Sequence, residues 1–333
     1  MTTRNDVARL AGVSTATVSR VVNGSSSVTE ETRESVLRAI RELNYVPNVI
    51  ARSLRTRSSY TLAFVVNDVT NPFFSELYRG ICDEANENGY AAFIYQYEDD
   101  MEHMSRLLER SVDGIITFLR FSEEILALIR QSKTPVFYIG KEREETEEAG
   151  ALRFDFAEAG YDMMHYLHRK GHRNIGLIAR GTRKFQDIHA GYVRACGELG
   201  LPYDERNIAW FDSNKFIVEA GCSAMHELLS RNLGLTAVVC NSDWVAVGAI
   251  SAAHSAGLKI PEDISIVGFD DLLISSYTTP PLTTVKTEGY EEGRLGCRML
   301  ISHLHGKSMP VQDLKGRLVE RGSVKDLTHG TEK

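Results

Sequence analysis

Residues 5–24 constrain the fold of this chain more than any other segment, and they run NDVARLAGVSTATVSRVVNG. Two short amphipathic stretches are separated by Gly12, which can take the positive φ that ends a helix. Thr3 and Ser14 occupy the positions expected of N-caps for the two helices. The pattern predicts a helix-turn-helix, a unit whose second helix lies in the major groove of DNA. A surface helical hairpin without a ligand is the alternative that these residues leave open.

The apolar residues of this segment predict which face of each helix is buried. Val7, Leu10 and Ala11 recur at helical spacing in the first helix. In the second helix the valines of residues 18–22 point inward, so small, hydroxylated residues and one arginine remain on the outward face. Such a face suits base edges and phosphates. Its members are Thr15, Ala16, Thr17, Ser19 and Arg20.

The next segment carries a family resemblance. A third helix is predicted to open at Thr29 and to bury Val36, Ile40 and Leu43, and residues 44–59 then run NYVPNVIARSLRTRSS. With this segment the chain resembles the lactose-repressor (LacI/GalR) family of bacterial transcription regulators. The motifs that carry the resemblance are Asp6-Val7-Ala8, Val13-Ser14…Thr17-Val18-Ser19, Asn23-Gly24 and Tyr45-x-Pro47-Asn48…Ala51-Arg52-Ser53-Leu54.

The resemblance implies a homodimer that binds a palindromic, double-stranded operator. We expect Thr15, Ala16, Thr17 and Arg20 to face the bases, with Arg20 best suited to a bidentate contact with guanine. Other polar groups of the head would position it on phosphates. These are Thr3, Ser14, Ser19 and Asn23.

The hinge after the head is predicted to fold only on DNA. Residues 48–56 make about two turns, and isolated helices shorter than about 12 residues are marginal in water. In the family, the residue that matches Leu54 wedges between base steps in the minor groove. The resemblance gives Asn48 a place at the start of this helix, Ala51 a close backbone approach, and Arg52 and Arg55 phosphate contacts.

The distribution of charge agrees with a DNA-binding head. The chain has 333 residues and a net charge of −7, but residues 1–59 hold nine arginines against five acids, about +4. The remainder has 29 basic and 40 acidic residues, about −11. A basic module joined to an acidic body is typical of a DNA-binding domain fused to a domain with another task.

From residue 60 onward, apolar strands alternate with amphipathic helices, which indicates α/β structure with parallel sheets covered on both faces. Eight strand–helix units are too many for one sheet, so two doubly wound lobes are predicted, and the resemblance implies the periplasmic-binding-protein-like arrangement. The expected strands are Leu62–Val66, Ala91–Tyr95, Gly114–Phe118, Val136–Ile139, Ile175–Ala179, Ile208–Phe211, Ala237–Cys240 and Ile264–Phe269. The expected helices include Phe73–Asn86, Glu158–Lys170, Ala190–Leu199, Val218–Ser230 and Trp244–Ala256.

The expected domains follow from these patterns and from the resemblance. Residues 1–46 form the helix-turn-helix domain, residues 47–59 the hinge helix and linker, and residues 60–330 the effector-binding and dimerisation domain. Within the last, lobe 1 is expected to span about 60–157 and 287–316, and lobe 2 about 158–286 and 317–328. Ligands of such folds bind beyond the carboxyl ends of the strands, here in the cleft between the lobes.

The resemblance extends through the body and implies effector-binding residues. Phe73 and Phe74 would supply aromatic packing, Phe216 a second apolar wall, and Asp270 an acceptor for ligand hydroxyls or amines. Asp243 precedes the helix expected from Trp244, so its role is either an N-cap or a ligand contact.

One departure from the family bears on the ligand. Relatives that bind sugars or purines often have an arginine two residues before an Ala-Gly-aromatic sequence, and Ile188 stands there in this chain. Lys184 lies in the same loop, and Lys141 and Arg120 follow other strand ends. A negatively charged ligand such as a phosphorylated sugar is one interpretation. Exposed loop charges without a ligand role, and regulation by a partner protein, are the other two.

Other patterns exclude functions rather than suggest them. Five dispersed cysteines include no CxxC pair, which indicates free thiols in a reducing compartment. The histidines at positions 165, 168 and 172 are not expected to bind a metal, because Gly171 breaks the helix before the third. No catalytic triad, P-loop or GxGxxG after a strand is found, so neither an enzyme nor a bound cofactor is expected.

Together these observations predict a cytoplasmic transcriptional regulator that binds DNA, a repressor of a metabolic operon. Its effector is expected to be a sugar or a sugar phosphate in the cleft, and no membrane association is expected, since the chain has no apolar run of membrane length. A ligand-binding protein of the same two-lobed fold without a role on DNA is the alternative from another class.

Overall fold

The structure is a computed structural model, and it describes residues 2–22, 27–45, 58–98, 100–140, 150–181, 187–211, 217–307 and 311–328. The chain divides into two compact units, Met1–Ser59 and Tyr60–Lys333, which are described separately below. Among the residues described, no helix combines the length and apolar character needed to cross a membrane.

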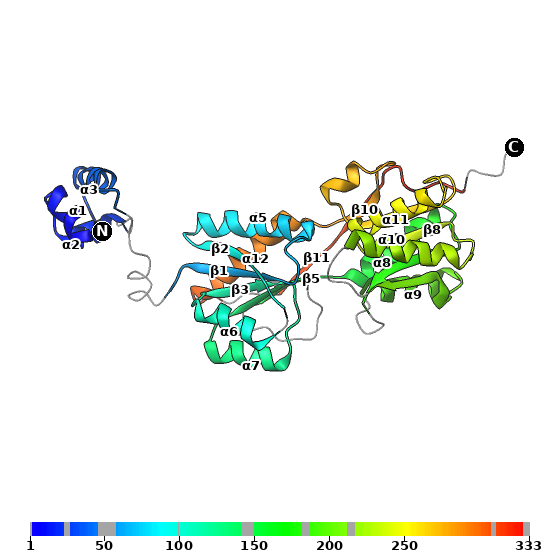
Figure 1. The fold of residues 1–333 in the computed structure, drawn as a ribbon, viewed down its shortest axis with the longest axis horizontal. Coiled ribbons are helices and arrows are strands. Elements are labelled where there is room, and N and C mark those ends of the chain that lie inside the picture. Colours follow the sequence, from blue (N-terminus) through cyan, green and yellow to red (C-terminus); the bar gives the residue numbers. More distant parts are fainter. Residues whose placement is uncertain are drawn as a thin grey trace. The chain divides into compact units, whose positions relative to one another are not determined.

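The N-terminal unit contains three helices, α1 (Arg4–Ala11), α2 (Thr15–Val22) and α3 (Glu30–Glu42) (Figure 1). Thr3 and Asp6 form a reciprocal capping box at the start of α1, and Gly12 ends that helix in the left-handed conformation at φ 68°. The hydroxyl of Ser14 accepts a hydrogen bond of 3.1 Å from the backbone N–H of Thr17 at the start of α2. The caps predicted from sequence are therefore present, and they set the turn between the first two helices.

The core of this unit is small and made largely of valine. Val7, Val18 and Val36 are fully buried at the junction of the three helices. Leu10, expected on the inner face of α1, is instead 46% exposed, and Ala8 takes the buried position. The buried face of this short helix is centred on the adjacent residues Val7 and Ala8, so Leu10 lies outside it.

The second unit is built on two six-stranded sheets, with strand orders β11-β5-β4-β3-β1-β2 and β12-β10-β9-β8-β6-β7 (Figure 1). We name the parts around the first and second sheets lobe 1 and lobe 2. Neighbouring strands are parallel except at β12, which pairs antiparallel with β10. The elements of lobe 1 are β1 (Thr61–Val66), α5 (Pro72–Glu87), β2 (Ala91–Gln96), α6 (Met101–Glu109), β3 (Gly114–Thr117), α7 (Glu123–Ser132), β4 (Val136–Ile139), β5 (Ala151–Phe154), α12 (Gly289–Leu304) and β11 (Gln312–Leu314).

Lobe 2 repeats the alternation of strand and helix, with two short 3-10 helices added. Its elements are α8 (Phe156–Arg169), β6 (Ile175–Arg180), α9 (Asp187–Leu199), η1 (Glu205–Asn207), β7 (Ile208–Phe211), α10 (Ile217–Ser230), β8 (Ala237–Cys240), α11 (Asp243–Ser255), β9 (Ser265–Asp270), η2 (Leu273–Ser276), β10 (Thr283–Lys286) and β12 (Arg317–Val319).

Each sheet is buried on both faces by a pair of helices. In lobe 1, Leu62, Phe64 and Val66 of β1 pack with α5 and α12, whereas Ala63 and Val65 pack with α6 and α7 on the opposite face. Figure 1 shows α5 on one side of this sheet and α6 and α7 on the other. Burial on both sides explains why β1 is apolar at almost every position, as parallel strands in covered sheets are. In lobe 2, α8 packs with α9 and α10 packs with α11.

Paired glycines allow three of these helix pairs to approach closely. A methyl group placed on Gly160 of α8 would lie 2.4 Å from the carbonyl oxygen of Ile188, and one on Gly191 of α9 would lie 1.8 Å from that of Ala157. Since no side chain fits there, the backbones of α8 and α9 are in direct contact. The same reciprocal arrangement occurs at Gly80 and Gly293 between α5 and α12, and at Gly221 and Gly248 between α10 and α11.

The structure adds to the elements expected from sequence. The eight predicted strands are present. The strands β5, β10, β11 and β12 were not predicted, because each of these three- or four-residue segments contains a charged residue and so lacks an uninterrupted apolar run. The five cysteines are free thiols, of which Cys196, Cys240 and Cys297 are buried.

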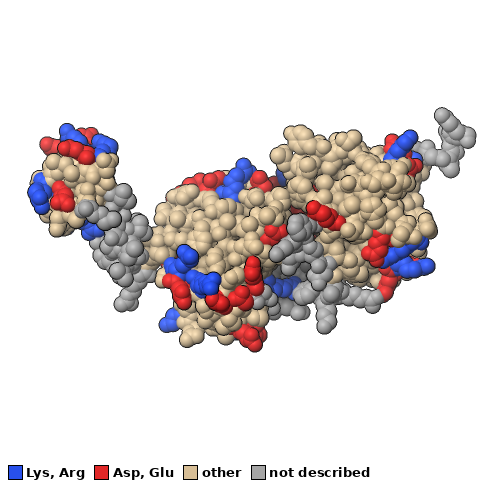
Figure 2. All heavy atoms as spheres, in the orientation of Figure 1, with Lys and Arg blue, Asp and Glu red and all other residues tan. Residues whose placement is uncertain are grey.

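Charged side chains on the visible face of the second unit are mixed in sign. Figure 2 shows acidic and basic side chains beside one another over α6 and α7, where Arg106 pairs with Glu102 and Arg130 pairs with Glu123. Such exposed pairs add little to stability. They do prevent a field of one sign over these two helices, so this surface does not have the character of a DNA-binding face.

The glycine contacts lead to a prediction with an internal control. Gly191→Ala should lower the free energy of unfolding by about 1–3 kcal/mol, because its methyl group overlaps the backbone of α8. Gly197→Ala, in the same helix but with nothing within 4 Å, should leave stability unchanged or raise it by up to about 1 kcal/mol. Urea denaturation of both variants measures the difference. Equal effects would show that α8 and α9 are not held in backbone contact.

Candidate functional site

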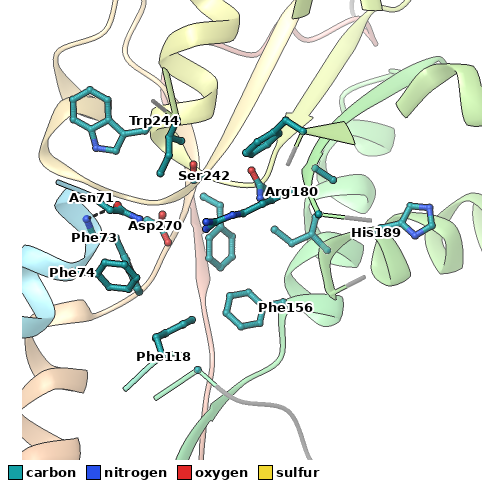
Figure 3. A pocket seen from close by; sticks show the side chains of 18 of the residues that line it. Asn71, Phe73, Phe74, Phe118, Phe156, Arg180, His189, Ser242, Trp244 and Asp270 are labelled. Carbon is teal, nitrogen blue, oxygen red and sulfur yellow. Dashed lines mark hydrogen bonds between the residues drawn. The ribbon is translucent and has the colours of Figure 1, made fainter. Parts of the chain in front are cut away.

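A cavity of about 490 Å³ lies between the two lobes of the second unit, beyond the carboxyl ends of their strands (Figure 3). Residues after β3 and β4 reach it from lobe 1, and residues at the ends of β6, β8 and β9 reach it from lobe 2. In parallel sheets these strand ends lie along one edge, which is where ligands of doubly wound folds bind. The volume suits a small molecule.

The start of α5 forms one wall because of its local sequence. Asn71 caps the helix, and its side-chain oxygen accepts a hydrogen bond of 3.1 Å from the backbone N–H of Phe73. Pro72 occupies the first helical position, where its missing N–H is not needed. The cap directs Phe73 and Phe74 to the cavity, as the family resemblance had led us to expect.

Aromatic rings continue from this wall across the cavity to the other lobe. Phe73 packs edge-on against Phe118 at 5.4 Å between ring centroids, and Phe118 packs against Phe156 at 6.4 Å. Phe156 in turn lies 5.7 Å from Phe269 of β9. Figure 3 shows Phe118 and Phe156 together on one side of the cavity. This phenylalanine row (Phe73, Phe118, Phe156, Phe269) gives the site a continuous apolar surface that both lobes share.

The end of β6 contributes a cation that the sequence reasoning missed. Arg180 is the last residue of that strand, and its side chain extends into the middle of the cavity (Figure 3). Arg120, three residues beyond the end of β3, lines the cavity from lobe 1. His189 also belongs to the lining, but its ring packs against Trp210 at 5.1 Å and lies 3.4 Å from the hydroxyl of Tyr203.

The turn after β8 presents polar atoms to the same space. Asn241, Ser242 and Trp244 all line the cavity. The side-chain oxygen of Asn241 and the indole nitrogen of Trp244 are buried and have no hydrogen-bond partner among the residues that the structure describes. Buried polar atoms are rarely left unsatisfied in native proteins, so these two are candidates for contact with a ligand.

Asp270 lines the cavity from the end of β9 in a strained backbone conformation. Its φ is 108° and that of Asp271 is 55°, a region that residues with a side chain seldom adopt. Burial, together with the nearby carboxylates of Asp243 and Glu292, raises the pKa of Asp270 well above its usual value. The carboxyl group therefore favours its neutral form, which can donate as well as accept a hydrogen bond.

Asp243 does not line the cavity, and the structure corrects its predicted place in the helix. The helix α11 begins at Asp243 itself and is capped by Ser242, whose hydroxyl accepts a hydrogen bond from the N–H of Val245. The fully buried carboxylate of Asp243 accepts hydrogen bonds from the hydroxyls of Ser275 and Thr284 and from the N–H of Leu272. It fastens the loop after β9, and burial raises its pKa to about 6 in spite of these bonds.

Glu292, in the first turn of α12, is a further buried carboxyl of this region. One of its oxygens accepts a hydrogen bond of 3.1 Å from the N–H of Glu288. Burial raises its pKa to about 7, against an ordinary value of 4.5. Asp243, Asp270 and Glu292 thus each resist ionisation, because desolvation penalises the charged form.

The predicted effector residues therefore divide into three groups. Phe73, Phe74, Arg120 and Asp270 line the cavity, and Asp243 lies behind it. Lys141, Lys184 and Phe216 lie outside the described residues. The sequence analysis missed six further residues that line the cavity. All of them lie at the end of a strand, just after one, or at the start of the helix that follows, so the positions of the strand ends could have identified them. They are Phe118, Phe156, Arg180, Asn241, Trp244 and Phe269.

The head presents the predicted DNA-reading face on α2. Thr15, Ala16 and Arg20 are exposed, while Thr17 and Ser19 are half-buried. Thr3 and Ser14 are exposed at the starts of α1 and α2, where N–H groups can bind a phosphate. Asn23 and the hinge residues Asn48, Ala51, Arg52, Leu54 and Arg55 lie outside the described residues.

A helix-turn-helix head and a two-lobed body with an interlobe cavity define a class of ligand-responsive DNA-binding proteins. Comparison with known families agrees: residues 3–48 match the model for bacterial regulatory proteins of the lacI family, and residues 164–324 match a periplasmic binding protein-like domain.

Whole-chain relatives extend this match. The transcriptional repressor CytR of Escherichia coli K12 is 34% identical over 98% of this chain and 97% of its own. A lac repressor dimer solved with operator and the anti-inducer ONPF has a TM-score of 0.83 at 26% identity, covering 97% of this chain and 99% of that one. A complex of the regulator CelR with cellobiose has a TM-score of 0.71 at 31% identity, covering 97% and 100%.

The chain belongs to the LacI family of bacterial transcriptional regulators. It joins a DNA-binding helix-turn-helix to a ligand-binding domain, and the relatives named above are regulators rather than enzymes.

The buried carboxyls predict how stability depends on pH. Since the pKa of Glu292 is raised in the folded protein, the folded state holds this proton more tightly, and stability falls as pH rises from about 4.5 to about 7. Glu292→Gln keeps the acceptor for Glu288 and removes the ionisation. The variant should therefore gain stability over the wild type as pH rises through that window, by at most about 1.4 kcal/mol for each pH unit.

Urea denaturation of the wild type and the variant at several pH values measures this gain. Glu291→Gln alters the exposed neighbour and is the matched control. A gain in stability that is the same at pH 4.5 and pH 7.5, or that Glu291→Gln reproduces, would contradict the assignment to Glu292.

Proposed function

We propose that this protein represses transcription by binding a palindromic operator as a homodimer, and that a small ligand in the interlobe cavity changes its affinity for DNA. The observation that carries the proposal is the presence, in one chain, of the helix-turn-helix and of a cavity whose walls come from both lobes. The similarity to CytR, named a repressor, and to a lac repressor dimer bound to operator supports it. Operator DNA as the partner makes the cytoplasm the expected location.

On DNA, the exposed face of α2 would lie in the major groove. Thr15, Ala16, Thr17 and Arg20 would contact base edges, and Arg20 has the planar donor pair that matches guanine. Thr3, Ser14, Ser19 and Asn23 would bind phosphates and so fix the orientation of the head.

The hinge would couple the head to the body. Residues 48–56 would become helical when two copies meet on the operator, with Asn48 at the start and Ala51 against the minor groove. Leu54 would insert between base steps, and Arg52 and Arg55 would contact phosphates. A helix near its folding midpoint responds to small changes in spacing, which makes it suitable as a switch.

The effector would be a sugar or a sugar phosphate. Phe73 and Phe74 would pack against its apolar face, and Asp270 would bind its hydroxyls. Arg120, Lys141, Lys184 and Phe216 complete the proposed set. The cellobiose complex of CelR supports a sugar as the class of ligand.

Two alternatives make different predictions. A partner protein acting in place of a small molecule would leave the cavity without a ligand that affects operator binding. A ligand-binding protein without a role on DNA would show only weak, salt-sensitive DNA binding with no preferred sequence. Selection of binding sites from random DNA by the purified chain, followed by footprinting, tests the proposal: a two-fold symmetric consensus is expected, and the absence of any consensus would contradict it.

The role of Arg20 gives a sharper prediction for the same experiment. Arg20→Ala should relax the preference at one base pair in each half-site, at a cost of about 1–3 kcal/mol in binding the preferred sequence. Arg38→Ala removes the same charge from an exposed position of α3 and should weaken binding evenly across sequences. If the selected consensus is the same for Arg20→Ala as for the wild type, Arg20 does not read bases.

A further inference from the structure

Two arginines reach the interlobe cavity from different lobes. Arg180 ends β6 in lobe 2 and extends into the middle of the cavity (Figure 3). Arg120 follows β3 and lines the cavity from lobe 1. Building on the ligand-responsive function above, we propose that the ligand carries an anionic group, a phosphate or a carboxylate, which Arg180 and Arg120 bind together. We call this pair the arginine clamp.

The geometry of the guanidinium group favours such a ligand. Its planar set of donors matches the oxygens of a carboxylate or phosphate, and hydrogen bonds between two charged groups are about twice as strong as neutral ones. A neutral hydroxyl gains much less from the same donors. An arginine whose side chain extends into the cavity therefore binds an anionic ligand more tightly than a neutral ligand of similar shape.

Buried carboxyl groups at the cavity and behind it bear on the binding of an anion. Asp270 is the acid that lines the cavity among the described residues, and the surrounding burial raises its pKa well above the usual value. Asp243 and Glu292, which lie behind it, have pKa values raised to about 6 and about 7 by burial. Asp270 is therefore the carboxyl that opposes a bound anion less than an ionised one would, whereas Asp243, with a pKa of about 6, is mostly ionised at neutral pH.

The other residues that line the cavity indicate the chemistry of the uncharged part of the ligand. The phenylalanine row offers an apolar surface that suits the C–H face of a sugar ring. The buried side-chain oxygen of Asn241 and the indole N–H of Trp244 have no hydrogen-bond partner among the described residues, so a ligand with hydroxyl groups would satisfy both. The structure therefore favours a polyhydroxylated molecule that bears an anion, either a sugar phosphate or a sugar acid.

Clamp residues from both lobes also imply a consequence for closure. A ligand whose anion contacts Arg180 alone has no electrostatic reason to prefer one arrangement of the lobes. One held by Arg180 and Arg120 at once binds best when the two lobes bring both guanidinium groups to it. Arg120 should therefore add affinity only in arrangements that bring it to the ligand, and Arg180 should contribute most of the affinity.

The test uses the full chain and matched probes at constant ionic strength: inorganic phosphate, glucose, glucose 6-phosphate and gluconate, each measured by calorimetry and by thermal unfolding. Inorganic phosphate and at least one of the two anionic sugars should bind the wild type and raise its Tm, and glucose should bind much more weakly. Glucose 6-phosphate and gluconate distinguish a phosphate from a carboxylate as the anion.

Variants assign the effect to the clamp. Arg180→Gln should weaken binding of inorganic phosphate about tenfold or more, Arg180→Lys should restore part of it, and Arg120→Gln should have a smaller effect. Arg110→Gln is the control, because Arg110 is an exposed arginine at the opposite end of β3 and does not line the cavity. Circular dichroism of each unliganded variant verifies its fold.

Three results would overturn the clamp: no response of the wild type to phosphate or to either anionic sugar, equal binding of glucose and the anionic sugars, or unchanged binding in Arg180→Gln. Operator binding is measured on the same preparations. Sequence-specific operator binding combined with any of these results contradicts the clamp alone, whereas loss of sequence-specific DNA binding by the wild type contradicts the proposed function.

Discussion

Burial of both faces of a parallel sheet decides where this protein can place chemistry. In β1 the side chains alternate between two helix layers, and neither face of the strand is open to solvent. A polar side chain there would lose its hydrogen bonds to water, which costs free energy unless a protein group replaces them. The residues that can meet a ligand are those at which strands end, and the direction of the strands brings these ends to one edge in each lobe. Two such edges enclose the cavity that holds Phe118, Arg180 and Asp270.

The same burial governs the charge state of the site. Asp243 satisfies its oxygens with Ser275, Thr284 and the N–H of Leu272, and yet its pKa remains above the ordinary value, because the hydrogen bonds do not fully replace lost water. Asp270 lies close enough for Asp243 to raise its pKa further. Burial thus biases Asp270, which lines the cavity, toward its neutral form, while Asp243 behind it, with a pKa of about 6, is mostly ionised at neutral pH.

Most of the architecture was predictable from the sequence, because it follows from local rules. The alternation of apolar strands and helices indicated two covered sheets, and Gly12, Ser14 and Asn71 stand at the turn and caps that their chemistry favours. What failed depended on distant partners. Nothing near Asp243 in the sequence indicates that Ser275 and Thr284, 32 and 41 residues away, occupy its carboxylate. Arg180 stands one residue beyond the predicted end of β6, where only the pairing of that strand decides which way the side chain points.

A ligand in a shared cavity can control DNA binding only through a difference in affinity between two arrangements of the lobes. A coupling of about 1–3 kcal/mol changes the affinity for a second site by about 5- to 150-fold, whereas a ligand that binds both arrangements equally changes nothing. The phenylalanine row spans the two lobes and offers a ligand dispersion contacts, which have little directional preference. Hydrogen bonds do depend on direction, and Arg120 and Arg180 donate them from opposite lobes. Contacts with these arginines can therefore stabilise one arrangement of the lobes more than contacts with the aromatic surface can. On this argument the aromatic residues supply affinity, and the charged residues determine whether binding is transmitted to the DNA-binding head.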